Sequence, residues 1–268
     1  MSTRKILGWK VGCSGFHYDD WKGTFYPVSL PKKKWFDYYS QRFNSLELNV
    51  TFYRFPQFKF FQNWYNNSPQ DFIFSVKVPR LITHYKQFRE TERMLNDFYH
   101  TCRSGLADKL GCVLFQLPPQ LQYSERILEI ILGQIDTSFE NVIEFRHPSW
   151  WNKKVYSLLE KNNVVFCSHS YPGLPEEIVI NSSLVYYRFH GVPVLYYSQY
   201  KRKFLEEVIS TIQQSEKVEK AFLYFNNTAT IAAIRNASHC QKLVGINAAA
   251  LSNPQSATKK PRLKVGGT

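Results

Sequence analysis

The chain has 268 residues, of which 44% are hydrophobic and 21% are charged. These values are typical of a globular protein and exclude an intrinsically disordered or fibrous chain. A single α/β barrel typically needs about 250 residues, so the length does not require two domains. The formal net charge of +13 favours anionic partners such as phosphate esters, nucleotides or nucleic acid. Four of these charges belong to Lys259, Lys260, Arg262 and Lys264, which leaves +9 on residues 1–258.

The cysteines and the first residues exclude several classes of protein. The five cysteines are odd in number and no two are spaced as Cys-x-x-Cys, which argues against a disulfide framework and a zinc ribbon. The N-terminal residues contain no long apolar core, so we expect no secretory signal. No stretch approaches the ~18 apolar residues of a membrane span. We therefore expect a soluble, cytoplasmic protein with reduced thiols and no membrane partner.

Short runs with β-strand character recur along the chain at regular spacing. They are Trp9–Ser14, Ser45–Asn49, Phe72–Lys77, Gly111–Leu117, Asn141–Arg146, Val164–Ser168, Leu184–His190 and Ala221–Asn226. Several are almost continuously apolar, as expected of parallel strands that are buried on both faces. Helical patterns separate most of them, so the predicted fold is α/β, a single (β/α)8 TIM-type barrel over residues 1–250. A doubly wound open sheet is the alternative, but no glycine-rich GxGxxG or Walker-type loop follows any of the runs.

Two segments depart from this regular pattern. Residues 169–183 contain Pro172, Gly173 and Pro175 and show little helical period, so the sixth helix of the barrel is predicted to be weak or missing. Residues 251–268 are polar and basic, and we expect a disordered tail there. The basic run of this tail could touch nucleic acid, but a solvated tail is the favoured interpretation.

Polar and charged residues gather at the carboxyl ends of the predicted strands, where barrels of this kind keep their active sites. In chain order they are Glu47, Asn49, Lys77, His84, Gln116, Glu144, Arg146, His147, His169, Arg188, His190, Asn226 and Asn227. Of the seven histidines, five lie at or just after a predicted strand end, which is the strongest functional signal in the sequence.

Alternation along a strand places three pairs of these residues on common faces: Glu47 with Asn49, Glu144 with Arg146, and Arg188 with His190. Lys77, Arg146 and Arg188 would then be fixed positive charges, suited to a phosphate or a carboxylate. Glu47 and Glu144 could act as general bases, as metal ligands, or only as the counter-ions of buried arginines.

Two further features concern the ligand. Gly191 and residues 226–228 lie in the loops after the seventh and eighth predicted strands, where barrels often bind phosphate; a simple helix cap is an equal alternative. A divalent metal would need ligands from separate strands, for instance Glu47, Glu144 and His190, because no HxxxH or HExxH motif occurs. Whether the protein binds a divalent metal as cofactor is therefore left open at this point.

Seven motifs in a fixed order carry a resemblance to a known family. They are Gly12-Cys-Ser-Gly15, Glu47-Leu-Asn-Val-Thr-Phe-Tyr53, Phe74-Ser-Val-Lys-Val-Pro79, Leu114-Phe-Gln-Leu-Pro-Pro119, Glu144-Phe-Arg-His-Pro148, Tyr187-Arg-Phe-His-Gly191 and Tyr224-Phe-Asn-Asn227. With them the chain resembles the YecE-like family, domain of unknown function 72. The resemblance implies a TIM-type barrel and the same strand-end residues, and no established reaction.

The chain departs from the pattern of that family at two places. Relatives often carry an Asp at the end of the sixth strand, where this chain reads Cys167-Ser168-His169. They often carry a His or Asp after the paired asparagines, where this chain has Thr228. A metal-binding or base role of an acidic group at either position does not carry over to this chain.

The leading hypothesis is an enzyme that acts on an anionic, phosphate-containing ligand, with phosphoester hydrolysis as the reaction. Glu47, Glu144 and His190 would be catalytic. The residues expected to bind the substrate are Asn49, Lys77, His84, Gln116, Arg146, His147, Arg188, Asn226 and Asn227. The alternatives are a nucleic-acid-binding protein with basic and aromatic loops, and a barrel that binds a metabolite without catalysis. A retaining glycosidase is disfavoured by the strands on which the carboxylates lie.

Overall fold

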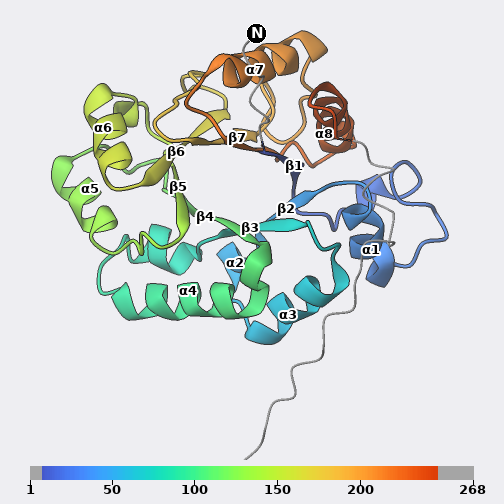
Figure 1. Cartoon of the computed structure of the whole chain (residues 1–268), viewed down its shortest axis with the longest axis horizontal. Helices are drawn as coiled ribbons and strands as arrows, with labels where there is room; N and C mark the ends of the chain where they lie inside the picture. The colour runs from blue at the N-terminus through green and yellow to red at the C-terminus, as the bar shows by residue number, and fades with distance from the viewer. Residues whose placement is uncertain (1–7, 247–268) are drawn as a thin grey trace, which may run out of the picture.

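Parallel strands β1 to β8 close into a barrel in which each strand pairs with the next and β8 pairs with β1 (Figure 1). The computed structural model describes residues 8–246. The strands are β1 Gly8–Ser14, β2 Ser45–Leu48, β3 Ile73–Lys77, β4 Leu110–Gln116, β5 Glu140–Glu144, β6 Val164–Ser170, β7 Leu184–Phe189 and β8 Lys220–Phe225. The predicted α/β barrel is confirmed.

Helices form a layer around the strands (Figure 1). They are α1 Trp35–Ser40, α2 Val50–Tyr53, α3 Phe58–Asn67, α4 Glu92–Leu106, α5 Glu125–Leu132, α6 Lys153–Lys161, α7 Arg202–Gln214 and α8 Ala232–Leu243. Shorter helical turns are η1 Asp19–Trp21, η2 Lys32–Lys34, η3 Leu81–Tyr85, η4 Ala107–Lys109 and η5 Pro148–Trp150. Residues 171–183, between β6 and β7, contain no helix, which confirms the missing sixth helix. Pro172, Pro175 and the positive φ of Gly173 are incompatible with a continuous helix there.

The apolar residues of the strands are buried on both faces of the sheet. Every residue of β6 and of β7 is buried, as expected for parallel strands covered by helices. One hydrophobic cluster lies between the strands and the helices and includes Val11, Leu46 and Phe74. A smaller one includes Leu114 and Tyr186, which alternation places inside the barrel. The interior is therefore packed below the polar carboxyl end.

Five strands end earlier than predicted, by one residue in β2, β4, β7 and β8 and by two in β5. Asn49, Arg146, His190 and Asn226 consequently lie in the loops that follow these strands, within two residues of the strand ends. Because the alternation of side chains continues over these short distances, the four residues still belong to the carboxyl end of the barrel.

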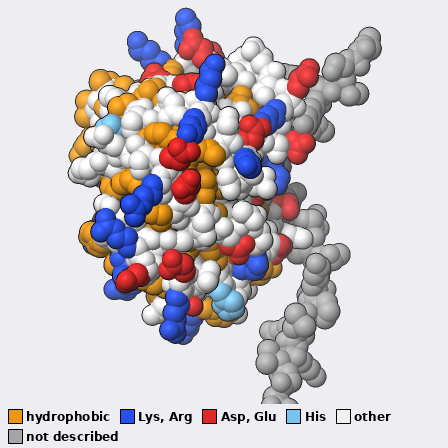
Figure 2. Space-filling view, turned by 90° about the vertical axis from the view of Figure 1, so that its left-hand side faces the viewer, with side chains coloured by type: hydrophobic (Ala, Val, Ile, Leu, Met, Phe, Trp, Pro, Cys, Tyr) orange, Lys and Arg blue, Asp and Glu red, His pale blue; other side chains and the backbone are white. Residues whose placement is uncertain are grey.

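The surface of the barrel carries both signs of charge on the face that Figure 2 shows, where blue and red side chains are interspersed. The exposed charged side chains form ion pairs such as Lys154–Glu125 and Lys217–Glu160. Within residues 8–246, no helix is both long and apolar enough to cross a membrane. The basic segment 251–268, predicted to be a tail, lies outside the described residues.

β1 and β2 approach each other closely at Gly12. The hydroxyl of Tyr39 lies between the two strands, where it accepts a hydrogen bond from the backbone N–H of Cys13 at 2.7 Å and donates one to the carbonyl of Ser45 at 3.0 Å. A Cβ atom at Gly12 would lie 2.0 Å from the Ser45 carbonyl oxygen and 2.8 Å from the Tyr39 hydroxyl. The position therefore has room only for a hydrogen atom.

We expect Gly12→Ala to lower the free energy of unfolding by about 2 kcal/mol or more, because the added methyl group must push β1 and β2 apart. Gly8→Ala on the same strand is the matched control, since its nearest neighbour would be 3.6 Å away, and it should change stability by less than about 0.5 kcal/mol. Urea denaturation of the two variants measures both values. Equal stabilities would show that β1 and β2 are not packed as described.

Candidate functional site

A buried ion-pair network connects three strands across the barrel interior. Arg188, at the end of β7, binds Glu47 of β2 with two hydrogen bonds, from Nε to Oε2 at 2.9 Å and from Nη2 to Oε1 at 2.6 Å. Its Nη1 donates to Oε2 of Glu144 at the end of β5. The hydroxyl of Tyr186 adds a hydrogen bond to Glu47 Oε2 at 2.6 Å. All these side chains are buried, so each carboxylate has its positive partner inside the protein.

Glu144 has a second group of partners on the side of the barrel mouth. The Nε of Arg146 donates to Glu144 Oε1, and His190 Nε2 lies 3.3 Å from the same oxygen. Burial alone would raise the pKa of Glu144, but Arg146, Arg188 and His190 outweigh it and hold this pKa well below its usual value. Burial and the charge of Arg146 lower the pKa of His190 well below its usual value. Glu144 is thus an ionised counter-ion and His190 a neutral imidazole.

Arg146 and His190 are fixed by neighbours from the adjacent loops. The guanidinium of Arg146 stacks over the ring of Tyr171, with 4.1 Å between its carbon Cζ and the ring centroid. Asn226 Nδ2 lies 2.9 Å from His190 Nδ1 and donates a hydrogen bond to it when the neutral imidazole carries its proton on Nε2. Arg146 Nη1 makes no hydrogen bond to another residue in the range 8–246. This donor is therefore available to a ligand.

Lys77, at the end of β3, has a buried amine in a different environment. Its Nζ donates to Gln116 Oε1 at 2.7 Å and lies 3.8 Å from the ring centroid of Phe52. Burial, together with the positive charge of Arg188, lowers the pKa of Lys77 to about 7. No carboxylate of residues 8–246 lies within 4.0 Å of its Nζ. Lys77 therefore has only neutral direct partners.

His84, from η3, completes this side of the mouth. Its Nδ1 lies 2.8 Å from Thr83 Oγ1, and its Nε2 lies 3.4 Å from Gln116 Nε2. Burial and the positive charges of Lys77, Arg146 and Arg80 lower the pKa of His84 to about 4. The imidazole is therefore neutral at pH 7 and a weak base.

Four buried polar atoms at strand ends have no hydrogen-bond partner among the described residues. They are Ser14 Oγ at the end of β1, Asn49 Oδ1 after β2, His169 Nε2 in β6 and Asn227 Oδ1 after β8. Alternation places Ser14 and Asn49 on the same faces of their strands as Gly12 and Glu47, toward the barrel interior. Buried polar atoms are normally hydrogen-bonded, so these atoms are available to water or to a ligand at the mouth.

Two residues expected at the site make hydrogen bonds to the neighbouring structure. His147 is the N-cap of η5, where its Nδ1 accepts a hydrogen bond from the backbone N–H of Ser149. Asn227 donates from Nδ2 to the carbonyl of Ser198 and to Asn236 Oδ1, and so attaches the loop after β7 to α8. The backbone N–H of Gly191, expected to face a phosphate, donates to the Tyr200 hydroxyl at 2.8 Å. These groups of the loops after β7 and β8 are thus hydrogen-bonded to other residues of the protein.

The remaining predicted residues come together at the mouth. They are Glu47, Asn49, Lys77, His84, Gln116, Glu144, Arg146, Arg188, His190 and Asn226. The sequence reasoning missed Tyr186, Phe52 and Tyr171 as their neighbours. Of these, Tyr186 had a usable signal, because it precedes Arg188 by two residues and so shares its face.

The carboxylates are not arranged as a metal site. Glu47 and Glu144 are separated by the guanidinium of Arg188, which binds both. Within residues 8–246, no group of three or more His, Cys, Asp and Glu side chains is placed to hold a metal ion. The geometry therefore favours the counter-ion role for both glutamates.

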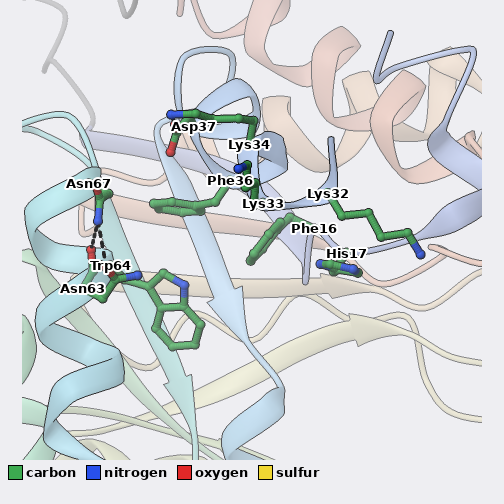
Figure 3. Close-up of a pocket in the computed structure, with 10 residues that line it drawn as sticks. All are labelled: Phe16, His17, Lys32, Lys33, Lys34, Phe36, Asp37, Asn63, Trp64 and Asn67. Atoms are coloured by element: carbon green, nitrogen blue, oxygen red, sulfur yellow. Dashed lines mark hydrogen bonds and ion pairs between the residues drawn. The ribbon is translucent and has the colours of Figure 1, made fainter. Parts of the chain in front are cut away.

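A hollow of about 390 Å³ lies outside the barrel, between η2, α1 and α3 (Figure 3). Lys32, Lys33, Lys34 and His17 line it together with the indole of Trp64. It is a second basic surface, separate from the network around Arg188, and any test of anion binding must distinguish the two.

We expect Arg188→Met to lower the free energy of unfolding by about 3–5 kcal/mol, since it leaves Glu47 and Glu144 buried without their shared partner. Lys217→Met removes the same charge from the exposed pair with Glu160, and should cost at most about 1 kcal/mol. Urea denaturation at pH 7 compares the two variants. Similar costs for both would contradict a buried network that holds the barrel together.

The sequence matches a family model described as "Protein of unknown function DUF72" over residues 10–262. The UPF0759 protein YecE of Escherichia coli K12 is 30% identical over 116 residues, which is 43% of this chain and only 42% of that relative. The UPF0759 protein YunF of Bacillus subtilis is 24% identical over 284 residues, covering 91% of this chain and 98% of YunF.

Solved structures agree with this assignment. The crystal structure of a DUF72 family protein from Thermotoga maritima superposes with a TM-score of 0.80 at 26% identity, over 89% of this chain and 99% of that one. A DUF72 family protein from Enterococcus faecalis gives a TM-score of 0.77 at 18% identity, over 89% and 96%, and supports the fold alone. The family match covers most of the chain and the barrel is shared, so this protein belongs to the DUF72 family.

Proposed function

We propose that the barrel mouth binds a small anionic ligand that contains phosphate. The balance of buried charge supports this proposal. Arg188 and Arg146 are matched by Glu47 and Glu144, whereas Lys77 has only Gln116 and an aromatic ring as direct partners. An anion at Lys77 would supply the missing negative charge and stabilise its protonated form.

Arg146 is the second contact of the proposed ligand. Its guanidinium is held by Glu144 and Tyr171, while Nη1 has no partner among the described residues. A guanidinium fixed in this way offers a directed donor to a phosphate oxygen without a large loss of side-chain entropy. The acceptor Asn49 Oδ1, also without a partner, could receive a hydroxyl group of the same ligand.

Hydrolysis of a phosphoester stays a prediction, and the geometry does not favour the glutamates as its bases. Both carboxylates accept hydrogen bonds from arginine, and Glu144 has a lowered pKa, so neither readily takes a proton. Of the three residues expected to be catalytic, His190 is the one that is not a counter-ion. Its imidazole is neutral, but burial and Arg146 make it a weak base.

Nucleic acid is a second candidate ligand because of an aromatic and basic patch made by Tyr53, Arg80 and Tyr85. The guanidinium carbon of Arg80 lies 5.4 Å from the ring centroid of Tyr53 and 5.3 Å from that of Tyr85. The tyrosines are 68% and 65% exposed, so their rings are open to stacking. Exposed aromatic rings beside arginine are typical of surfaces on which single-stranded bases stack.

Isothermal titration calorimetry with inorganic phosphate tests the anion site. We expect the wild-type protein to bind phosphate and Arg146→Ala and Lys77→Met each to weaken binding about tenfold or more, because each removes a charge-assisted hydrogen bond. Lys33→Ala, in the hollow outside the barrel, is the control and should leave the affinity unchanged.

The opposite result would contradict the proposal. If Lys33→Ala loses phosphate binding while Arg146→Ala and Lys77→Met keep it, the anion binds in the hollow outside the barrel. Titration with a single-stranded oligonucleotide distinguishes the second candidate. Oligonucleotide binding that weakens with salt and is lost in Tyr53→Ala, without phosphate binding at Arg146, would favour nucleic acid.

A further inference from the structure

The two buried lysines of the barrel are held in opposite ways. Lys109 Nζ donates to three oxygens, the carbonyls of Tyr65 and Ser68 and the Ser68 hydroxyl, at 2.7–2.8 Å. Its three N–H groups are thus matched by three acceptors, as in a structural ammonium. Lys77 Nζ has one hydrogen-bond acceptor among the described residues, Gln116 Oε1, and otherwise faces the ring of Phe52.

This environment suits a neutral amine better than an ammonium ion. A neutral amine has two N–H groups and a lone pair, so a single acceptor leaves fewer of its polar groups unsatisfied. Burial lowers the pKa of Lys77 to about 7, so roughly half of the molecules carry the neutral amine at pH 7. Neutral lysines of this kind are the nucleophiles of carbonyl chemistry.

We propose that Lys77 forms an imine with the carbonyl group of a small aldehyde or ketone that carries an anionic group. The lysine lies at the carboxyl end of β3, where barrels place reacting groups, and it keeps 7% of its surface exposed. This reaction goes beyond the proposed anion binding, because it requires the lone pair of Lys77 and not its charge.

Neighbouring side chains can hold the reacting groups by hydrogen bonds. His84 and Lys77 contact the same Gln116 side chain and the same Phe52 ring. Since its low pKa makes His84 a weak base, it assists as a hydrogen-bond partner while a proton passes from nitrogen to oxygen. Asn49 Oδ1, buried and without a partner, can hold a hydroxyl group of the carbonyl compound, and Arg146 Nη1 can hold its anionic group.

The step balances without an oxidant or a reductant. The lone pair of Nζ forms the C–N bond, the π electrons of the C=O bond move to oxygen, and a proton passes from nitrogen to that oxygen. The C–O bond of the resulting carbinolamine then breaks while the nitrogen lone pair forms the C=N bond, and the second proton of nitrogen leaves with the hydroxyl group as water. When the imine is protonated, the anionic group of the bound compound balances its positive charge.

Reductive trapping tests this inference. The full-length protein is incubated with glyoxylate, a small anionic aldehyde, and cyanoborohydride, which reduces an imine to a stable secondary amine. Peptide mapping by mass spectrometry then locates the modified lysines. We expect Lys77 to be modified about tenfold or more faster than Lys109 or the exposed lysines at pH 7, because far more of its amine is neutral.

The rate of modification should fall as the pH is lowered below about 7, which is the pKa set by the groups around Lys77. The charged and titratable groups that face it are Arg188, Arg146, Glu144, Glu47 and His84. Lys77→Arg, which keeps a charge but has no reactive amine, should lose the rapid modification.

Modification spread over the exposed lysines, with no enrichment at Lys77, would overturn the inference. Because the mapping uses the wild-type protein, this outcome is readable even if the variant is unstable. Phosphate binding without trapping at Lys77 would refute the imine alone. Trapping without phosphate binding would refute the anion site alone.

Discussion

The ion pairs from Glu47 through Arg188 to Glu144 cross the barrel interior, and the electrostatics of the mouth depend on them. Burying one carboxylate without a partner costs several kcal/mol, so Glu47 could not lie inside the barrel without Arg188, and Glu144 would keep only Arg146. Arg188 donates from all three guanidinium nitrogens to the two carboxylates, and thereby joins β2, β5 and β7. The same ion pairs therefore stabilise the barrel and fix the geometry of the site.

This network also determines which charges remain for a ligand. Arg188 forms ion pairs with both glutamates, and Arg146 forms one with Glu144. The net charge of +13 therefore does not indicate how much positive charge is available to a ligand at the mouth. What remains is local: Arg146 Nη1 and the amine of Lys77, beside the neutral imidazoles of His84 and His190. The mouth thus presents a few hydrogen-bond donors in fixed directions. On the outer surface over α5 and α6, basic and acidic side chains are mixed (Figure 2).

Much of the fold could be predicted from the sequence because its signals are local. Parallel strands buried on both faces are recognisable as apolar runs, and the ends of β2, β7 and β8 came within one residue of expectation. The site could be predicted as a set of strand ends, because barrel closure brings the carboxyl ends of all strands together.

The pairing within that set could not be predicted, because it depends on which side chains meet across the closed barrel. Arg188 and Glu47 are 141 residues apart in sequence, and no local pattern says that this arginine binds both glutamates. His147 and Asn227 were expected to bind substrate because they lie near strand ends. Their structural hydrogen bonds arise from the neighbouring backbone and from α8, which strand alternation does not describe.

The pKa of the Lys77 ε-amino group is the most direct test of the proposed site. It shows whether this buried amine lacks a charged partner that a bound anion supplies. NMR of protein with ¹³C-labelled lysine measures this pKa, and Lys77→Arg assigns the resonance. We expect a pKa of about 7 in the free protein and a rise of about one unit or more at saturating phosphate, since the anion stabilises the charged form. A value near 10.4, the ordinary value for lysine, in the free protein, or no change with phosphate, would contradict this expectation.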